Sequence, residues 1–288
     1  MDLCNAGYVR ELMSTFGLAF RKEWGQNFLT DHSAVERIAD ACGVGDPHTV
    51  LEIGAGAGAL TRELAMRYDN IIAVEIDRGL IPLLGYVLDD CKNVRLVCAD
   101  IMKTDLGELL APAFERGGVS LCANLPYYIT TPILLGLLDS RLPFGSITVM
   151  IQSEVADRLV AAPGTPEYGS VTAYLGYFGV THKLFDVTAD KFLPPPKVDS
   201  TVVRIDLYRE KPYVPENEEI FFRTLRAAFG QRRKTLPNAL AAGFGELTKP
   251  QLTEAVISAG FGADIRGERL STEDFVRLSD EINRRIIK

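Results

Sequence analysis

The sequence predicts an α/β fold in which a mostly parallel sheet is followed by a small all-helical domain. Over the first half of the chain, short apolar runs alternate with helix-like stretches, and this alternation favours a parallel sheet that helices cover on both faces. The length of 288 residues exceeds a typical domain of about 100–200 residues. Beyond residue 217 the apolar periodicity becomes helical, so a second, smaller domain is expected.

The elements of the first domain follow from these periods. Residues 31–43 are expected to form a helix, because Val35, Ile38 and Ala39 recur at helical spacing. Two later runs, 172–180 and 200–208, have strand composition without an intervening helix, which favours an antiparallel pair at the sheet edge. The parallel strands are expected at 50–55, 71–77, 94–100, 119–125 and 147–152.

The second domain is expected after a linker over residues 211–217. The last helix is indicated by Phe275, Leu278, Ile282 and Ile286 at helical spacing. It begins with Ser271 and Asp274, a pair that offers a capping box. We therefore expect a larger sheet domain over 1–210 and a helical domain over 211–288.

Composition bounds the class of protein. The chain is 47% hydrophobic and 24% charged, as ordinary globular domains are, and no run approaches the ~20 apolar residues that span a bilayer. The N-terminus lacks the features of a signal peptide. Five cysteines without a CxxC pair indicate reduced core residues, and the three histidines have no partners at metal-ligand spacing. We expect a cytoplasmic monomer with neither a metal nor a membrane partner.

A glycine-rich loop points to a nucleotide-like ligand. The run from Glu52 to Gly58 follows a strand and opens a helix, where a backbone without side chains lets a ligand approach closely. Glu75 ends the next strand, where a carboxylate can accept hydrogen bonds from a ribose diol. A bare glycine turn beside a solvated glutamate is the structural alternative. A nicotinamide cofactor also stays open, because the loop satisfies GxGxxG/A.

Four successive strand ends carry polar or glycine residues, namely Gly54, Glu75, Asp100 and Asn124. The carboxyl ends of parallel strands line the ligand crevice of an open sheet. Polar residues that merely end strands would explain any one of the four, but less readily all of them. The four positions together therefore predict one binding crevice.

The segment from Asn124 to Tyr127 suggests a chemistry. An adenine amine is a poor nucleophile because its lone pair is delocalised into the ring. The Asn124 carboxamide oxygen and the Leu125 carbonyl can accept its hydrogens and stabilise the developing positive charge. Pro126 fixes the turn, and Tyr127 offers a ring on which a base can stack.

Six blocks of sequence resemble the bacterial 16S ribosomal RNA adenine dimethyltransferase family, within the rRNA adenine N(6)-methyltransferase superfamily. They occur in the family's order, from about Arg21 to the C-terminus, and are GQNFLTD at 25–31, VLEIGAGAGALT at 50–61, VEID at 74–77, NLPYYITTPIL at 124–134, FLPPPKVDS at 192–200 and FGQRRKTL at 229–236. The chain departs from the family's pattern at Ala55, at Ser153 and over 168–173. These departures affect the expected RNA contacts more than the expected reaction.

The resemblance implies a Rossmann-like, seven-stranded class I methyltransferase sheet with a helical C-terminal domain. It implies S-adenosylmethionine as the cofactor, with Gln26 assisting the contacts made by Asn27, Leu29, Gly54, Glu75, Asp100 and Asn124. It assigns catalysis to Asn124, Leu125 and Tyr127. It also implies that Tyr127 and Phe192 sandwich a flipped adenine, although for Phe192 core packing beside the proline turn stays open.

The implied reaction is dimethylation of the exocyclic amine of adenines in 16S ribosomal RNA, within a small ribosomal subunit or its precursor. One alternative is a large-subunit methyltransferase that confers antibiotic resistance, which shares the QNF and NxPY motifs; the blocks PPPKVDS and FGQRRKTL favour the small-subunit family. Another is an RNA-binding assembly factor on the same fold. Intact Glu75, Asp100 and Asn124 argue for retained catalysis.

A basic cluster is the expected RNA footprint of a protein whose net charge is −7. Its members occur without an intervening acid and are Arg223, Arg226, Arg232, Arg233 and Lys234. Such a cluster is often a solvated helix face, but in an acidic protein it is the best candidate for phosphate binding. We expect Arg232, Arg233 and Lys234 to hold RNA, and Lys22, Lys191 and Lys197 to extend this surface around the cleft.

Overall fold

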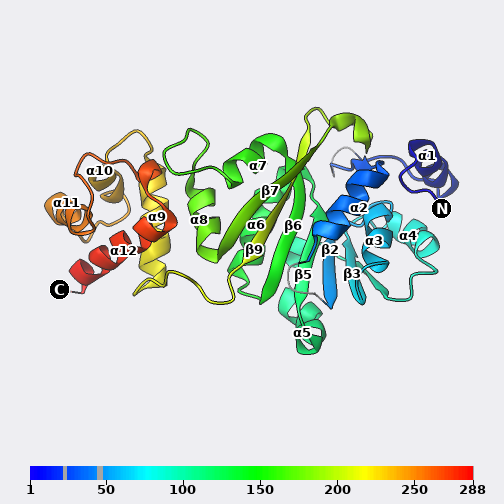
Figure 1. The fold of residues 1–288 in the computed structure, drawn as a ribbon, viewed down its shortest axis with the longest axis horizontal. Coiled ribbons are helices and arrows are strands. Elements are labelled where there is room, and N and C mark those ends of the chain that lie inside the picture. The colour runs from blue at the N-terminus through cyan, green and yellow to red at the C-terminus, as the bar shows by residue number, and fades with distance from the viewer. Residues whose placement is uncertain (22–24, 44–47, 288) are drawn as a thin grey trace. The chain divides into compact units, whose positions relative to one another are not determined.

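A computed structural model of the chain describes residues 1–21, 25–43 and 48–287, and it contains a seven-stranded sheet (Figure 1). The strand order is β4-β3-β2-β5-β6-β9-β7. The strands are β2 (Thr49–Ile53), β3 (Asn70–Glu75), β4 (Val94–Cys98), β5 (Val119–Asn124), β6 (Phe144–Gln152), β7 (Gly179–Val187) and β9 (Ser200–Leu207). The pairs among β2 to β6 are parallel, and β9 runs antiparallel to β6. The five predicted parallel strands are therefore confirmed.

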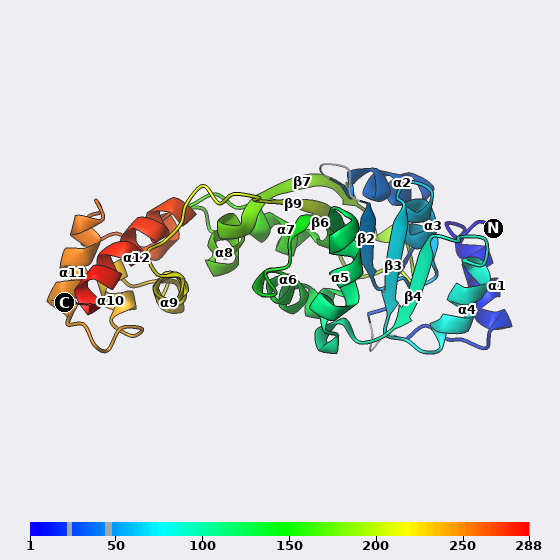
Figure 2. The same cartoon turned by 90° about the horizontal axis from the view of Figure 1, so that it is seen from below.

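The middle of the sheet is buried on both sides. Every residue of β2 is buried, as the apolar run predicts for a strand that is covered by helices. Figures 1 and 2 show α2 (His32–Ala41) and α3 (Ala59–Ala65) over one face, with α5 (Leu106–Arg116) and α6 (Thr130–Asp139) over the other. The predicted helix over 31–43 is α2, which Asp31 caps by accepting from the Ala34 N–H at 2.9 Å.

Three further helices and a small sheet complete this part of the chain. The helices are α1 (Ala6–Thr15), α4 (Leu80–Val87) and α7 (Ser153–Leu159). The small sheet pairs β1 (Phe28–Leu29) antiparallel with β8 (Phe192–Leu193). It brings the QNF segment beside the start of the proline-rich block.

The predicted strand over 172–180 is wrong. Those residues form most of α8 (Ser170–Phe178), and the edge strand β7 begins only at Gly179. The aromatic side chains of α8 pack on α9 (Glu218–Gly230), with ring centroids of Tyr177 and Phe221 4.7 Å apart. Because α8 is short and buried on several sides, its sequence lacks the polar face from which a helical period can be recognised. The predicted strand over 200–208 is β9.

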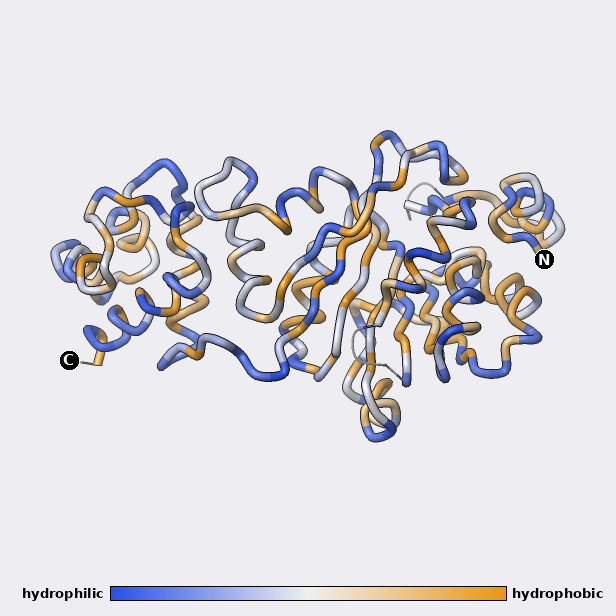
Figure 3. Tube along the Cα trace, in the orientation of Figure 1, coloured by the Kyte–Doolittle hydropathy of each residue, from blue (hydrophilic) through white to orange (hydrophobic). Residues whose placement is uncertain are grey.

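The chain divides into two compact units. One comprises Met1–Ala156 with His182–Arg209, and the other comprises Asp157–Thr181 with Glu210–Lys288. The expected boundary after residue 210 does not account for residues 157–181, which group with the C-terminal part. Residues 211–217 contain neither helix nor strand, and Figure 3 shows the segment after β9 as mostly hydrophilic.

The C-terminal unit is helical. Besides α8 and α9 it contains α10 (Leu236–Leu240), α11 (Lys249–Ser258) and α12 (Thr272–Ile286). Phe221, Phe244 and Phe275 are completely buried in it. The predicted capping box at the start of α12 is confirmed: the Ser271 N–H donates to Asp274 at 2.9 Å, and the Asp274 N–H donates to the Ser271 hydroxyl at 3.2 Å.

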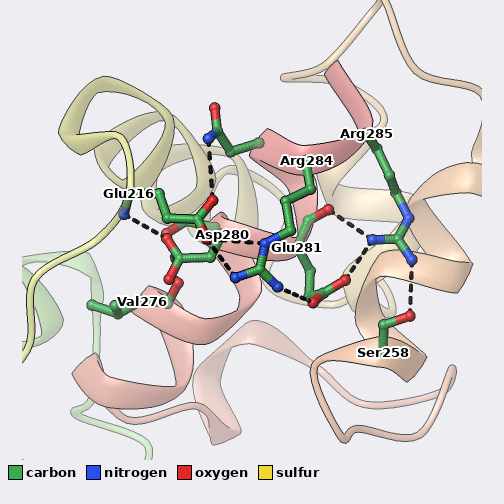
Figure 4. A network of polar contacts seen from close by, with 9 residues as sticks. Glu216, Ser258, Val276, Asp280, Glu281, Arg284 and Arg285 are labelled. Atoms are coloured by element: carbon green, nitrogen blue, oxygen red, sulfur yellow. Dashed lines mark hydrogen bonds and ion pairs between the residues drawn. The ribbon is translucent and has the colours of Figure 1, made fainter. Parts of the chain in front are cut away.

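A polar network joins the linker to α12 (Figure 4). The Arg284 side chain donates to Glu216 and, at 2.8 Å, to Glu281. Arg285 donates to Glu281 at 2.7 Å and to the Ser258 hydroxyl at 2.8 Å. These arginines are consequently held by acidic partners within the unit.

Further findings concern membrane-spanning helices, metal-binding groups and the burial of the cysteines. Among the residues that the structure describes, no helix combines the length and apolarity needed to cross a membrane, and no group of three or more His, Cys, Asp or Glu could hold a metal ion. The cysteines are less uniformly buried than expected: Cys42 and Cys122 lie in the core, but Cys98 is exposed.

Candidate functional site

A cleft lies at the carboxyl ends of β2, β3 and β5. The structure brings most of the predicted site residues together on its wall, namely Gln26, Asn27, Leu29, Gly54, Glu75, Asn124, Leu125 and Tyr127. Asp100 and Phe192 do not line this cleft.

The glycine loop is shaped by conformations that side chains rarely adopt. Gly56 has φ 57°, and its N–H donates to Glu75 Oε2 at 2.9 Å. A Cβ at Gly56 would lie 3.1 Å from the Phe28 ring. Gly58, at φ 89°, is the N-cap of α3. The loop therefore presents bare backbone to the cleft at the start of a helix, where a ligand can approach closely.

Glu75 organises this wall. Its Oε1 accepts from the Asp77 N–H at 2.8 Å, its Oε2 accepts from Gly56, and only 5% of the residue is exposed. Burial raises the pKa of Glu75, while the backbone N–H donors partly oppose that shift. A carboxylate held in this way is available to the hydroxyls of a bound ligand.

Glu52 is a residue of the cleft that the sequence reasoning missed. It lines the cleft and is 1% exposed, and none of the described residues gives its Oε2 a hydrogen bond. Burial raises its pKa to about 8. Its position as the first residue of the glycine-rich block was the signal that could have singled it out.

Asn124 is oriented by the QNF segment. Its Nδ2 donates to the backbone carbonyl of Asn27 at 3.1 Å. With the amide nitrogen committed to that bond, the carboxamide oxygen remains to accept hydrogens from a ligand. Leu125 follows with 1% exposure, and its N–H donates to the Met150 carbonyl at 3.2 Å. The end of β5 is thus fixed from both neighbouring segments.

Asp77 forms a second attachment for the QNF segment. It is 3% exposed and accepts from Gln26 Nε2 at 2.9 Å and from the Gly79 N–H at 2.9 Å. Arg21 Nε lies 3.6 Å from the same carboxylate. Gln26, which we expected to assist the cofactor, is therefore committed to Asp77. The VEID motif contains Asp77, but nothing in the sequence indicated its partners.

Asp100 lies in a neighbouring cleft instead. That cleft is lined by Cys98, Lys103 and Ile76 as well as Asp100. Ile76 is 49% exposed and lines both clefts, so it joins them. Asp100 accepts from the Met102 N–H at 3.0 Å, and Lys103 Nζ lies 3.4 Å from it.

The two aromatic candidates differ in their surroundings. Phe192 lies opposite Leu29 in the small sheet and is 4% exposed within the hydrophobic core. This arrangement corresponds to core packing, the alternative to a stacking role. Tyr127 is half-buried on the cleft wall, on the 3-10 helix η3 (Tyr127–Ile129). Its hydroxyl lies 2.6 Å from the Ser200 hydroxyl.

The fold divides the basic cluster into paired and unpaired members. Arg223 pairs with Glu246 at 2.7 Å, so acids distant in sequence do reach the cluster. Arg232 lies 3.5 Å from Glu268 and donates to the carbonyls of Pro166 and Tyr168 at 3.1 and 2.9 Å. Within the described chain, the side chains of the exposed Arg233 and Lys234 have no such partner.

The outlying lysines are placed differently from one another. Lys191 pairs with Asp31 at 2.9 Å, and Lys197 is exposed. Lys22 lies outside the described residues. Arg233 and Lys234, like the exposed Arg226, are therefore better phosphate candidates than Arg223, Arg232 and Lys191, because within the described chain none of them must first give up an internal partner.

Known proteins are similar to this chain in sequence and in fold. A sequence model described as ribosomal RNA adenine dimethylase matches residues 17–284. A ribosomal RNA small subunit methyltransferase A of Geobacillus thermodenitrificans is 41% identical over 284 residues, which cover 98% of this chain and 97% of that protein. Its namesake of Clostridioides difficile is 41% identical over 278 residues, 96% of each chain.

Two solved structures resemble the chain as well. A dimethyladenosine transferase from Plasmodium falciparum superposes with a TM-score of 0.77 at 25% identity, covering 89% of this chain and 97% of that one. The 23S rRNA methyltransferase ErmE gives a TM-score of 0.69 at 25% identity, with coverage of 89% and 100%. The similar proteins thus include some named for the small ribosomal subunit and one named for 23S rRNA.

Proposed function

The chain belongs to the ribosomal RNA adenine dimethylase family, and on that premise we propose that it dimethylates the exocyclic amine of adenines in 16S ribosomal RNA with methyl groups from S-adenosylmethionine. The observation that carries this proposal is the single cleft that Gly54, Glu75, Asn124 and Tyr127 line together. We further propose that the substrate is a small ribosomal subunit or its precursor, and that the enzyme acts as a cytoplasmic monomer.

The cleft fits the proposed cofactor in two respects. The bare backbone at Gly54 and Gly56 admits a ligand, and Glu75 can accept hydrogen bonds from ribose hydroxyls. Ile76 and Asp100 continue the surface into the neighbouring cleft. Asn27 and Leu29 complete the wall. S-adenosylmethionine would supply a methyl group that is already activated on a sulfonium.

The residues of the chain then act on the amine. The Asn124 oxygen and the Leu125 carbonyl accept its hydrogens and stabilise the positive charge that develops on the nitrogen during methyl transfer. Tyr127 offers its ring to the base, and Phe192 would need to turn out of the core to form the opposite side of a sandwich. The remaining contribution of the protein is proximity and alignment.

A small-subunit substrate is favoured over a large-subunit one. Relatives about 41% identical over nearly the whole chain carry small-subunit names, whereas the similar 23S enzyme is 25% identical. Arg233 and Lys234 provide an exposed basic surface for the RNA backbone. Arg232 shapes that surface through its carbonyl contacts.

Product analysis tests the proposal directly. Purified enzyme is incubated with labelled S-adenosylmethionine and unmethylated small or large subunits, and the nucleosides are analysed by mass spectrometry. We expect dimethyladenosine in small-subunit RNA only. Label confined to large-subunit RNA would favour the resistance-enzyme alternative, and RNA binding without any label would favour an assembly factor.

A further inference from the structure

We infer that Ser200 is a positioning residue, which fixes the ring of Tyr127 by a hydrogen bond between their hydroxyl groups and so aligns the target base. The inference rests on the proposed function, because it needs Tyr127 to carry the base. It also gives a role to the last residue of the FLPPPKVDS block, which served above only as a mark of the family.

The contact is short and shielded. The Tyr127 and Ser200 hydroxyl oxygens are 2.6 Å apart, and Ser200 is completely buried, while Tyr127 is half-buried on the cleft wall. Burial raises the pKa of Tyr127 above its ordinary value of 10.0. The phenol therefore stays protonated at neutral pH, and its hydroxyl serves as an anchor and not as a base.

The anchor reaches across one strand of the sheet. Asn124 at the end of β5 is in register with Met150 of β6, and Gln152 of β6 is in register with Ser200 of β9. The Tyr127 side chain therefore passes the end of β6 to reach β9. The position of the ring is tied to a strand two places away from the strand that carries the proposed acceptor.

Ser200 is itself held in place. The carbonyl of Asp199 accepts from the Ser153 N–H at 3.1 Å, and its Oδ1 accepts from the Ala189 N–H at 2.9 Å. The Thr201 hydroxyl donates to Asp186 Oδ1 at 2.6 Å. Because the residues on either side are fixed, the Ser200 hydroxyl has a defined direction. This rigid support is what a residue that aligns a base requires.

A double-mutant cycle tests the inference. Tyr127→Phe, Ser200→Ala and the double variant are compared with the wild type on undermethylated small subunits. We expect each to lower kcat by about two- to tenfold, as the loss of one hydrogen bond implies, and the double variant to be no slower than the worse single variant. The dissociation constant of S-adenosylmethionine should be unchanged, because neither hydroxyl belongs to its proposed contacts.

Ser146→Ala is the matched control. It removes another completely buried hydroxyl of the same sheet, one that lies 3.0 Å from the Ser120 hydroxyl, and should leave kcat unchanged. Normal kcat for Ser200→Ala, or losses that multiply in the double variant, would overturn the inference. If Ser200→Ala fails to fold, normal kcat for Tyr127→Phe does so alone. A wild type that methylates no RNA would instead refute the proposed function.

Discussion

The Asn124 carboxamide is the atom group on which the proposed chemistry depends. Its nitrogen is held by the Asn27 carbonyl, so only the oxygen can face the substrate amine. Asn124→Ala should lower kcat by about 10²–10³-fold, the loss typical of one preorganised group that stabilises transition-state charge. Single-turnover methylation measures it. Asn70→Ala, at the opposite end of β3 from Glu75, is the control, and a near-normal rate for Asn124→Ala would contradict the acceptor role.

Glu52 makes stability depend on pH. Its folded pKa of about 8 lies above its ordinary value of 4.5, so the folded state keeps a proton that the unfolded chain loses. The free energy of unfolding therefore falls as pH rises from about 4.5 to 8. The fall amounts to about 1.4 kcal/mol for each unit by which the folded and unfolded pKa values differ. Glu52→Gln removes this loss. Its Tm advantage over the wild type should grow between pH 5 and 9 without cofactor; an equal Tm difference at every pH would refute the assignment.

The sequence predicted which candidate residues line one cleft where their placement follows from local pattern. Gly54, Glu75 and Asn124 end successive strands, and strand ends meet at one edge of a parallel sheet. It missed Asp77, whose partner Gln26 lies 51 residues earlier, and Ser200, whose partner Tyr127 lies 73 residues earlier. No spacing rule connects residues so far apart.

At the scale of elements, the attachment of the QNF segment to β3 should control cofactor affinity. Asp77→Asn removes the negative charge near Arg21 and one of the two oxygens that accept from Gln26 and the Gly79 N–H. Since this segment forms one wall of the cleft, we expect S-adenosylmethionine binding to weaken by about five- to tenfold, the scale of one charge-assisted hydrogen bond.

Calorimetry measures the effect of Asp77→Asn. Asp69→Asn is the matched control, because its carboxylate is 73% exposed and contacts only His48 among the partners described for it. Equal affinity for Asp77→Asn and the wild type would show that the segment keeps its place without this contact. A loss of kcat at saturating cofactor would indicate that Asn124 has moved with it.

The element predicted wrongly shows where periodicity fails. In α8, Ala173, Leu175 and Tyr177 are buried alternately, which is the period of a strand. Its aromatic residues also favour strands. The contacts of Tyr177 and Phe178 with α9 decide the conformation instead. Because α9 lies later in the chain, the local sequence pattern does not show these contacts.

For the whole molecule, RNA affinity should depend on few cations. Arg233→Ala/Lys234→Ala removes two exposed cations without partners in the described chain. The slope of log affinity against log salt should become shallower by up to about two units, because fewer counterions are released. Cofactor affinity should not change. Filter binding at several salt concentrations measures the slope.

Two comparisons sharpen that measurement. Lys249→Ala removes an exposed cation elsewhere in the C-terminal unit, so an equal change in slope for each charge removed would mean that net charge, and not the cluster, governs binding. Arg232→Ala should chiefly lower Tm, since it leaves the carbonyls of Pro166 and Tyr168 without their donor.

The division of the chain into units governs how it can be made. Strand β9 lies between β6 and β7 in the sheet, although it is the last of the three to be synthesised. A nascent chain cannot complete the sheet until β9 has left the ribosome, and residues 157–181 of the second unit precede both β9 and their partner α9 in the chain. The segments of the two units are therefore made in alternation, and a fragment cut at the linker would leave the aromatic face of α9 without α8.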